Sequence, residues 1–296
     1  MNYYCPYCYS DHPPSDFRSD IVRFGRFRRT SDQKYIPRFR CQKCLKTFSQ
    51  ASFDPCYKQL KRQHNQDIQQ DYTSGVSQRR LARNLGLDRK TIKRKLLFLG
   101  IQAMMLLNDF NSRFPKATEI EFDELETYEH TKCKPVSIPI AVEAKTRRIL
   151  AFAVAQMPAK GRLVEKALKK YGPRPDMRAE GRRKVFESLK SLVKPNVVIR
   201  SDQNPHYPAD IKVHFPESVH ITVKGKRGAI TGQGELKKVG YDPIFSLNHT
   251  CAMMRYQMSR MIRKTWCTSK KRKYLELHFA LSALVHNLHL PVKTQT

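Results

Sequence analysis

The stretch that decides the fold of the larger part of this chain is Val197-Val198-Ile199-Arg200-Ser201-Asp202. Its short apolar run predicts a buried strand that ends at Asp202. Upstream, three alternating segments between residues 118 and 155 predict an antiparallel meander, and a short fifth strand follows at residues 219–223. The order of these segments predicts an α/β domain built on a mixed five-stranded sheet.

Helical patterns lie between and after these strands. Apolar residues at positions 185, 189, 192 and 193 share one face of a helix that precedes the fourth strand. Residues 246–264 predict a long helix, and residues 274–289 predict a last amphipathic helix. Residues 205–214 are compatible with either a helix or a strand, so the sequence leaves that segment open.

Two aspartates fall at the ends of predicted strands. Asp123 ends the first strand and Asp202 ends the fourth, and these two strands can be neighbours in an open sheet. Both carboxylates would then meet at one edge, where hard oxygen ligands hold Mg²⁺. A pair of such ions activates a nucleophile and stabilises the leaving oxygen in phosphoryl transfer. Aspartate is also common in loops, so position alone does not establish a site.

Two Cys-x-x-Cys pairs open the chain, Cys5 with Cys8 and Cys41 with Cys44. Each pair can form a turn that directs two thiolates to one point, so together they supply the four ligands of a tetrahedral zinc site. We therefore expect residues 1–50 to form a zinc ribbon with structural Zn²⁺. The alternative is a pair of disulfides in a small secreted domain. The first residues lack the charged start and apolar run of a secretory signal, so we expect a cytoplasmic protein with reduced thiols.

The charge of the chain points to a polyanionic partner. It carries 56 Lys and Arg residues against 26 Asp and Glu residues, a formal net charge of +30. Such an excess favours binding to nucleic acid, although ribosomal and chromatin proteins can be equally basic. The most apolar segment, residues 96–107, is too short to span a membrane and is interrupted by Gly100 and Gln102. We therefore expect no membrane partner.

Residues 56–100 carry a helix-turn-helix pattern. Ser77 can cap a first helix, Gly86 supplies the turn, and Asp88 can cap a second helix. The second helix has a narrow apolar side and is otherwise cationic, as a helix in a DNA major groove requires. Its predicted DNA-binding residues are Arg89, Lys90, Lys93 and Arg94. The alternative is a helical hairpin with a purely structural role.

A boundary is expected after this helical region. Residues 101–116 predict a linker, because Pro115 and a shift to acidic residues follow the helical pattern. Residues 117–296 then form the predicted α/β domain, with the last amphipathic helix at its C-terminal end.

Several motifs of the chain resemble those of the DDE transposases of bacterial insertion sequences. The resemblance is carried by residues 122–127, 200–202, 242–250 and 260–270, and it covers nearly the whole chain. It implies a ribonuclease-H-like catalytic domain, an N-terminal zinc ribbon and a helix-turn-helix. It also implies DNA cleavage and strand transfer with Mg²⁺ or Mn²⁺ held by three side chains. The implied partner is double-stranded DNA, at element ends and target, bound by a homo-oligomer associated with the nucleoid.

The third catalytic side chain departs from that family's pattern. The family has a Glu on the last core helix with a basic residue two turns later, whereas this chain has Asn248 followed by Arg255. The resemblance implies the catalytic set Asp123, Asp202 and Asn248. Asn can ligate Mg²⁺ through its carbonyl oxygen but brings no charge, so Glu124 or Glu126 could contribute. Rivals for the third position are Glu235 and His249.

Basic residues beyond Asn248 are expected to follow the DNA end. Arg255, Arg263 and Lys264 belong to a stretch, residues 243–275, that contains no acidic residue. Phosphate contact is the predicted role of this stretch, and a solvated surface is the alternative. The main function predicted is a DNA transposase. The alternative is a non-catalytic DNA-binding protein derived from one, which the neutral Asn248 favours.

Overall fold

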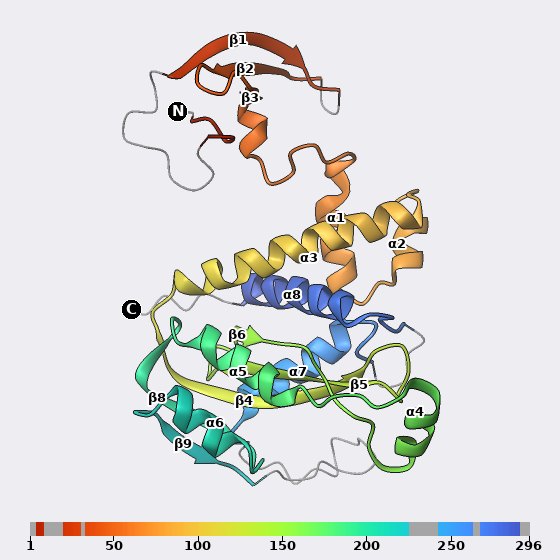
Figure 1. Ribbon diagram of the computed structural model, residues 1–296, viewed down its shortest axis with the longest axis vertical. Coiled ribbons are helices and arrows are strands. Elements are labelled where there is room, and N and C mark those ends of the chain that lie inside the picture. Colours follow the sequence, from red (N-terminus) through yellow and green to blue (C-terminus); the bar gives the residue numbers. More distant parts are fainter. Residues whose placement is uncertain (1–3, 9–19, 31–32, 225–241, 263–266, 291–296) are drawn as a thin grey trace. The chain divides into compact units, whose positions relative to one another are not determined.

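The computed structural model describes residues 4–8, 20–30, 33–224, 242–262 and 267–290 (Figure 1). The chain divides into two compact units, residues 1–65 and residues 66–296. None of the helices in the described ranges combines the length and the apolarity needed to cross a bilayer.

The first unit is a small antiparallel sheet with an aromatic core. Its strands are ordered β1-β2-β3 and comprise β1 (Ile21–Arg28), β2 (Tyr35–Cys41) and β3 (Thr47–Ser49). Phe39 and Phe48 pack together with ring centroids 5.8 Å apart, beside the buried Cys5 and Cys41. Short 3₁₀ segments follow at Gln50–Phe53 and Arg62–His64.

The second unit begins with three helices, which are α1 (Asn65–Thr73), α2 (Gln78–Asn84) and α3 (Arg89–Ser112). Both predicted caps are confirmed. The Ser77 hydroxyl accepts from the Arg80 N–H at 3.4 Å, and the Asp88 carboxylate accepts from the Lys90 N–H at 2.6 Å. Gly86 adopts a φ of 60° in the turn between α2 and α3. Helix α2, the turn at Gly86 and helix α3 therefore follow one another as the helix-turn-helix pattern predicts.

Helix α3 is longer than the sequence predicted. It continues to Ser112 through most of the expected linker at residues 101–116. The reason is packing, because Ala103, Leu107 and Asn111 extend its buried face by two more turns. The helical region therefore belongs to the same compact unit as the sheet, instead of standing as a separate domain.

Helix α3 lies beside α8 (Arg272–His289), as Figure 1 shows. Gly100 permits this close approach. A Cβ added at Gly100 would lie 2.7 Å from the Leu277 Cβ and 2.9 Å from the Leu277 carbonyl oxygen. The glycine that interrupts the apolar run in the sequence is thus the residue over which α8 crosses.

The large sheet is mixed, as predicted. Its order is β6-β5-β4-β8-β9, with β7 paired to β5. Strand β4 is antiparallel to β5 and parallel to β8, and β8 is parallel to β9. The sheet has six strands instead of five, because the predicted segment 148–155 forms two short strands, β6 and β7. The bounds are β4 (Ala117–Tyr128), β5 (Pro135–Glu143), β6 (Ile149–Phe152), β7 (Ala155–Gln156), β8 (Val193–Ser201) and β9 (Val219–Thr222).

Helices cover both faces of this sheet. On one face, Phe122 and Ile199 pack with residues of α5 (Arg178–Leu189) and α6 (Tyr207–His214). The segment that the sequence left open is thus helical. On the other face, Ile140 packs in a cluster that contains residues of α3, α8 and α7 (Phe245–Gln257). Helix α4 (Val164–Tyr171), which the sequence analysis missed, lies between β7 and α5 in the chain.

Helix α7 is shorter than predicted, since it ends at Gln257 and not near residue 264. The chain turns at Arg260, whose guanidinium donates to the Tyr72 hydroxyl and to the Tyr274 carbonyl. These bonds link the turn to α1 and α8, and they account for the early end of α7.

Candidate metal and nucleic-acid sites

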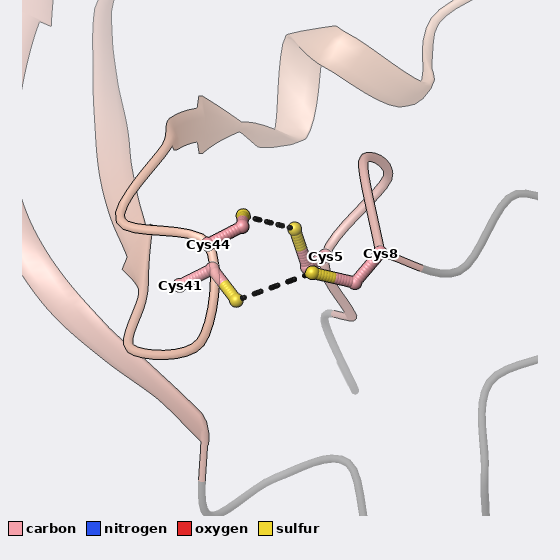
Figure 2. A group of neighbouring side chains, drawn as sticks. All are labelled: Cys5, Cys8, Cys41 and Cys44. Atoms are coloured by element: carbon pink, nitrogen blue, oxygen red, sulfur yellow. Dashed lines mark hydrogen bonds between the residues drawn. The ribbon is translucent and has the colours of Figure 1, made fainter.

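The four cysteines of the first unit converge on one point. Figure 2 shows Cys5 and Cys8 on a turn near the N-terminus, facing Cys41 and Cys44 on the turn after β2. The four Sγ atoms lie within 4.8 Å of one another. The sequence therefore identified this cluster correctly, and it could hold a metal ion.

The sulfur spacing fits a tetrahedral ion and not disulfides. The Cys5 and Cys44 sulfurs are 3.6 Å apart, and the Cys8 and Cys41 sulfurs are 3.8 Å apart. Thiolates about 2.3 Å from one tetrahedral zinc ion would lie about 3.8 Å from one another. A disulfide would need sulfurs about 2.05 Å apart, and all four cysteines are free.

Backbone donors prepare this cluster for thiolate ligands. The backbone N–H of Lys46 lowers the pKa of the Cys44 thiol to about 7. Burial raises the pKa of Cys5, so that thiol needs a bound cation to remain ionised. The turn thus supplies one readily ionised ligand, and the other ligands depend on the metal.

The second site is built on the register between β4 and β8. These parallel strands place Phe122 beside Ser201, and Asp123 and Asp202 are the next residue on each chain. Adjacent strands lie about 4.8 Å apart. The structure therefore brings the two predicted carboxylates to neighbouring positions. Asp123 does not end its strand as predicted, because pairing with β5 continues β4 to Tyr128.

The surroundings of Asp123 make its ionised form less favourable. Burial raises the pKa of Asp123 to about 6, and the negative charge of Asp202 adds to the shift. The Glu124 N–H and the Tyr207 hydroxyl both donate to Asp123 Oδ1, at 2.6 Å and 3.3 Å. Burial raises the pKa of Tyr207, so this hydroxyl keeps its proton and remains a donor. A cation between the carboxylates would offset the repulsion.

Asp202, like Asp123, is partly exposed. Its Oδ1 accepts a hydrogen bond from the Asn204 N–H at 3.1 Å. It also lines an open hollow of about 460 Å³ with Arg178 and residues 203–206.

Asn248 lies in the first half of α7 and is exposed. Its Nδ2 donates to Asp242 Oδ2 at 2.9 Å, and within the described ranges no hydrogen bond joins it to Asp123 or Asp202. Arg255 is two turns further along the same helix. Between them, Cys251 is buried, and burial together with the charge of Asp123 raises the pKa of that thiol to about 12. This side of α7 therefore faces the Asp123 carboxylate.

Glu121 is a residue that the sequence analysis missed. It lies two positions before Asp123 on β4, on the same face of the sheet, and is only 4% exposed. Its Oε2 accepts from the Leu247 N–H at 2.6 Å, and burial raises the pKa of this carboxyl. The signal in the sequence was the alternation of acidic side chains at 119, 121 and 123, which places them all on one face.

Two carboxylates suggested as helpers are committed elsewhere. Glu124 accepts from Arg182 at 2.9 Å and from the Ser137 hydroxyl at 2.5 Å. Glu126 pairs with Lys160 at 2.5 Å on the surface. Because side chains alternate along β4, both point to the face opposite Asp123. The rival ligand Glu235 lies outside the described residues, as do Arg263 and Lys264.

The predicted DNA-binding side chains of α3 all reach solvent. Arg89, Lys90, Lys93 and Arg94 are exposed over the first two turns of the helix. Lys93 lies over the Tyr274 ring, with its Nζ 5.3 Å from the ring centroid.

Comparisons with known proteins assign no family to this chain. No family model matches it, and no curated protein matches it. A solved structure described as the crystal structure of the Mos1 Strand Transfer Complex aligns with 78% of this chain and 79% of its own, at 10% identity and a TM-score of 0.24. A score that low supports no conclusion about fold or function.

Proposed function

We propose that this chain is a metal-dependent DNA transposase that cleaves and joins DNA at the ends of a mobile element. The observation that supports this most is the pairing of Asp123 with Asp202 on adjacent parallel strands. The raised pKa of Asp123 supports it further, because a buried carboxylate beside a like charge is typical of a cation site.

The topology supports a ribonuclease-H-like catalytic domain. Three strands form an antiparallel meander, and two parallel strands add to the side of the first one. This is the arrangement that the family resemblance implies. Asp123 lies within β4, and Asp202 directly follows the neighbouring strand β8.

The roles of the residues follow from their positions. Asp123 and Asp202 hold Mg²⁺ or Mn²⁺, which when bound activates the attacking oxygen and stabilises the leaving one. Asp123 is ionised at neutral pH, since its pKa is about 6. Asn248 would complete the ligand set through its carbonyl oxygen, and Arg255 would offset phosphate charge. Water is the first nucleophile, and a DNA 3′-hydroxyl is the second.

DNA binding is divided between the two units. In the first unit, Cys5, Cys8, Cys41 and Cys44 hold a structural Zn²⁺ that fixes the ribbon. In the second, Arg89, Lys90, Lys93 and Arg94 contact element-end DNA, and Arg255, Arg263 and Lys264 follow the DNA towards the carboxylates. We propose that the protein acts as a homo-oligomer on DNA.

Strand transfer on a pre-cleaved element end tests the catalytic part of this proposal. The substrate comes from inverted repeats in the DNA that flanks the coding sequence. We expect activity in Mg²⁺ or Mn²⁺ and its loss in Asp202→Ala, with duplex binding retained. Full activity in Asp202→Ala would refute the proposal.

A non-catalytic DNA-binding protein derived from a transposase is the second candidate. It is favoured by Asn248, which is neutral and is hydrogen-bonded to Asp242 at 2.9 Å. This candidate predicts tight DNA binding with no strand transfer in either metal.

A further inference from the structure

A basic cavity lies between α3, α8 and the chain that joins α7 to α8. It has a volume of about 350 Å³. Four cationic side chains line it, and none of its described lining residues is an aspartate or a glutamate. The four are Arg89, Lys93, Arg260 and Lys270. A cavity with this charge attracts an anion, because no carboxylate in its walls offsets the cations.

Arg260 is fixed in the wall by neutral partners. Its guanidinium donates to the Tyr72 hydroxyl at 2.8 Å, to the Tyr274 carbonyl at 2.9 Å and to the Ser269 hydroxyl. In the described part of the chain no carboxylate pairs with it. Arg260 is therefore a positioned cation with its charge available to a ligand, which lowers the entropic cost of binding.

His278 adds an unsatisfied polar group at the same cavity. Its ring stacks on Tyr72 with centroids 3.8 Å apart, and it is 2% exposed. Neither ring nitrogen has a hydrogen-bond partner among the described residues. Burial and the charge of Arg260 lower its pKa well below the usual value, so the ring is neutral and keeps one N–H donor.

Two of the cations belong to the exposed surface of α3. Arg89 and Lys93 are one turn apart, and Lys90 and Arg94 continue the same cationic surface outside the cavity. Lys93 is already held over the Tyr274 ring at 5.3 Å. An anion in this cavity would thus be continuous with whatever polyanion lies along α3, which favours a DNA backbone over a small free anion.

We propose that this cavity binds one phosphate of the DNA backbone, held jointly by α3 and by the segment after α7. The inference rests on the proposed function, because that function supplies DNA as the ligand. A phosphate held in this way would align the DNA with helix α7. Arg260 and Lys270 follow α7 in the chain, so a shared phosphate would fix the DNA on α3 relative to the helix that carries Asn248.

The salt dependence of duplex binding tests the proposal. The probe is a short DNA duplex of mixed sequence, and the proteins carry Asp123→Asn so that no cleavage occurs. The variants are Lys93→Ala, Lys270→Ala and the double variant. Lys190→Ala is the control, since Lys190 is exposed at the end of α5, which packs on the opposite face of the sheet.

Each single variant should lower the slope of log K against log salt below that of Lys190→Ala, by no more than about one, the value of one phosphate contact. The double variant should lower it by no more than about one in total, because both side chains neutralise the same phosphate. Lys190→Ala should leave the slope unchanged.

A double variant that lowers the slope by about two would overturn the proposal, because the two lysines would then contact separate phosphates. A slope in Lys270→Ala equal to that of Lys190→Ala would overturn it too. Neither result depends on catalysis. If the protein with Asp123 intact shows no strand transfer while the slopes are as expected, the transposase is refuted and the cavity assignment stands.

Discussion

Glu121 accepts a hydrogen bond of 2.6 Å from the backbone N–H of Leu247, which ties the strand of Asp123 to the first turn of α7. The adjacent Ser246 hydroxyl accepts from the Lys145 N–H at 2.9 Å, so the turn between β5 and β6 is held at the same place. Helix α7 thus starts from a fixed point on the central strand, and the positions of Asn248 and Arg255 depend on it.

Removing the Glu121 carboxylate should destabilise the second unit. We expect Glu121→Ala to lower the free energy of unfolding by about 1–3 kcal/mol, because the Leu247 N–H would be left without an acceptor. Glu121→Gln keeps a side-chain oxygen and should lose less. Urea denaturation measures both variants. Glu119→Ala is the control, since its pair with Arg200 is partly exposed and worth at most about 1 kcal/mol. Equal losses in Glu121→Ala and Glu119→Ala would contradict the role of Glu121.

Ionisation of Asp123 should lower the free energy of unfolding. Its pKa is about 6 in the folded protein, against 3.8 for an ordinary aspartate. The favourable contribution of its protonated form is therefore complete below about pH 4 and is lost as the pH rises through 6. At pH 7.5 without divalent metal, we expect Asp123→Asn to stabilise the protein by up to about 3 kcal/mol.

Thermal unfolding at several pH values measures this effect. The gain in Asp123→Asn should shrink towards pH 4, and added Mg²⁺ should raise the Tm of the parent more than that of the variant. Asp109→Asn, in an exposed pair with Arg113, should change stability by less than about 0.5 kcal/mol. A gain that is independent of pH would show that ionisation is not its cause.

A side chain at Gly100 should push α3 away from α8. The added Cβ of Gly100→Ala would lie 2.7 Å from the Leu277 Cβ and 2.9 Å from a backbone oxygen, which cannot move without the helix. We expect a loss of about 1–3 kcal/mol in the free energy of unfolding, which exceeds the gain of about 1 kcal/mol that alanine brings to a helix. The control is Asn108→Ala, which is exposed on the same helix and should be neutral or slightly stabilising. Stabilisation by Gly100→Ala would mean that the two helices are not in close contact.

Metal removal should unfold the first unit alone. Sulfurs 3.6 Å and 3.8 Å apart predict about one zinc per chain, and Cys5→Ser or Cys41→Ser should lose it. Cys56→Ser, outside the cluster but in the same unit, is the matched control and should keep the metal. Metal analysis gives the number of zinc ions per chain. A chelator should unfold the first unit without changing the unfolding of residues 66–296. Retention of zinc in Cys41→Ser would contradict the four-thiolate site.

The sequence predicted the elements whose signals are local. Such signals are the apolar run at residues 197–199, the caps at Ser77 and Asp88, and the paired cysteines. Each can be recognised from neighbouring residues in the chain, and the structure confirms all of these elements. The extension of α3 to Ser112 could not be predicted in this way, because its buried face becomes evident only when α8 lies beside it. The commitment of Glu124 to Arg182 likewise depends on a partner 58 residues away in the chain.

The proposed catalytic residues show the same limit. The adjacency of Asp123 and Asp202 followed from strand order, which local patterns reveal. The partner of Asn248 did not, since Asp242 reaches it by a hydrogen bond across the turn before α7 and no periodic pattern signals such a contact.

Asn248 is the residue whose substitution separates the two candidate functions. If its carbonyl oxygen completes the metal site, Asn248→Ala should lower strand transfer, more in Mg²⁺ than in Mn²⁺, which tolerates an imperfect ligand set. Asn248→Glu should keep or raise activity by restoring a charged ligand. The structure adds a complication, because Asp242 Oδ2 lies 2.9 Å from the Asn248 amide and would repel a new carboxylate. Asn248→Glu combined with Asp242→Asn should therefore be more active than Asn248→Glu alone.

Strand transfer on pre-cleaved ends measures these variants, with Asp242→Asn as the control that keeps Asn248 intact. Duplex binding should remain unchanged throughout, since the net charge of +30 alters by at most one unit in each variant. Full activity of Asn248→Ala in both metals would exclude Asn248 from the ligand set and leave Glu235 and His249 as the remaining rivals. An inactive parent that gains activity only in Asn248→Glu with Asp242→Asn would instead identify a former transposase that now acts by binding DNA.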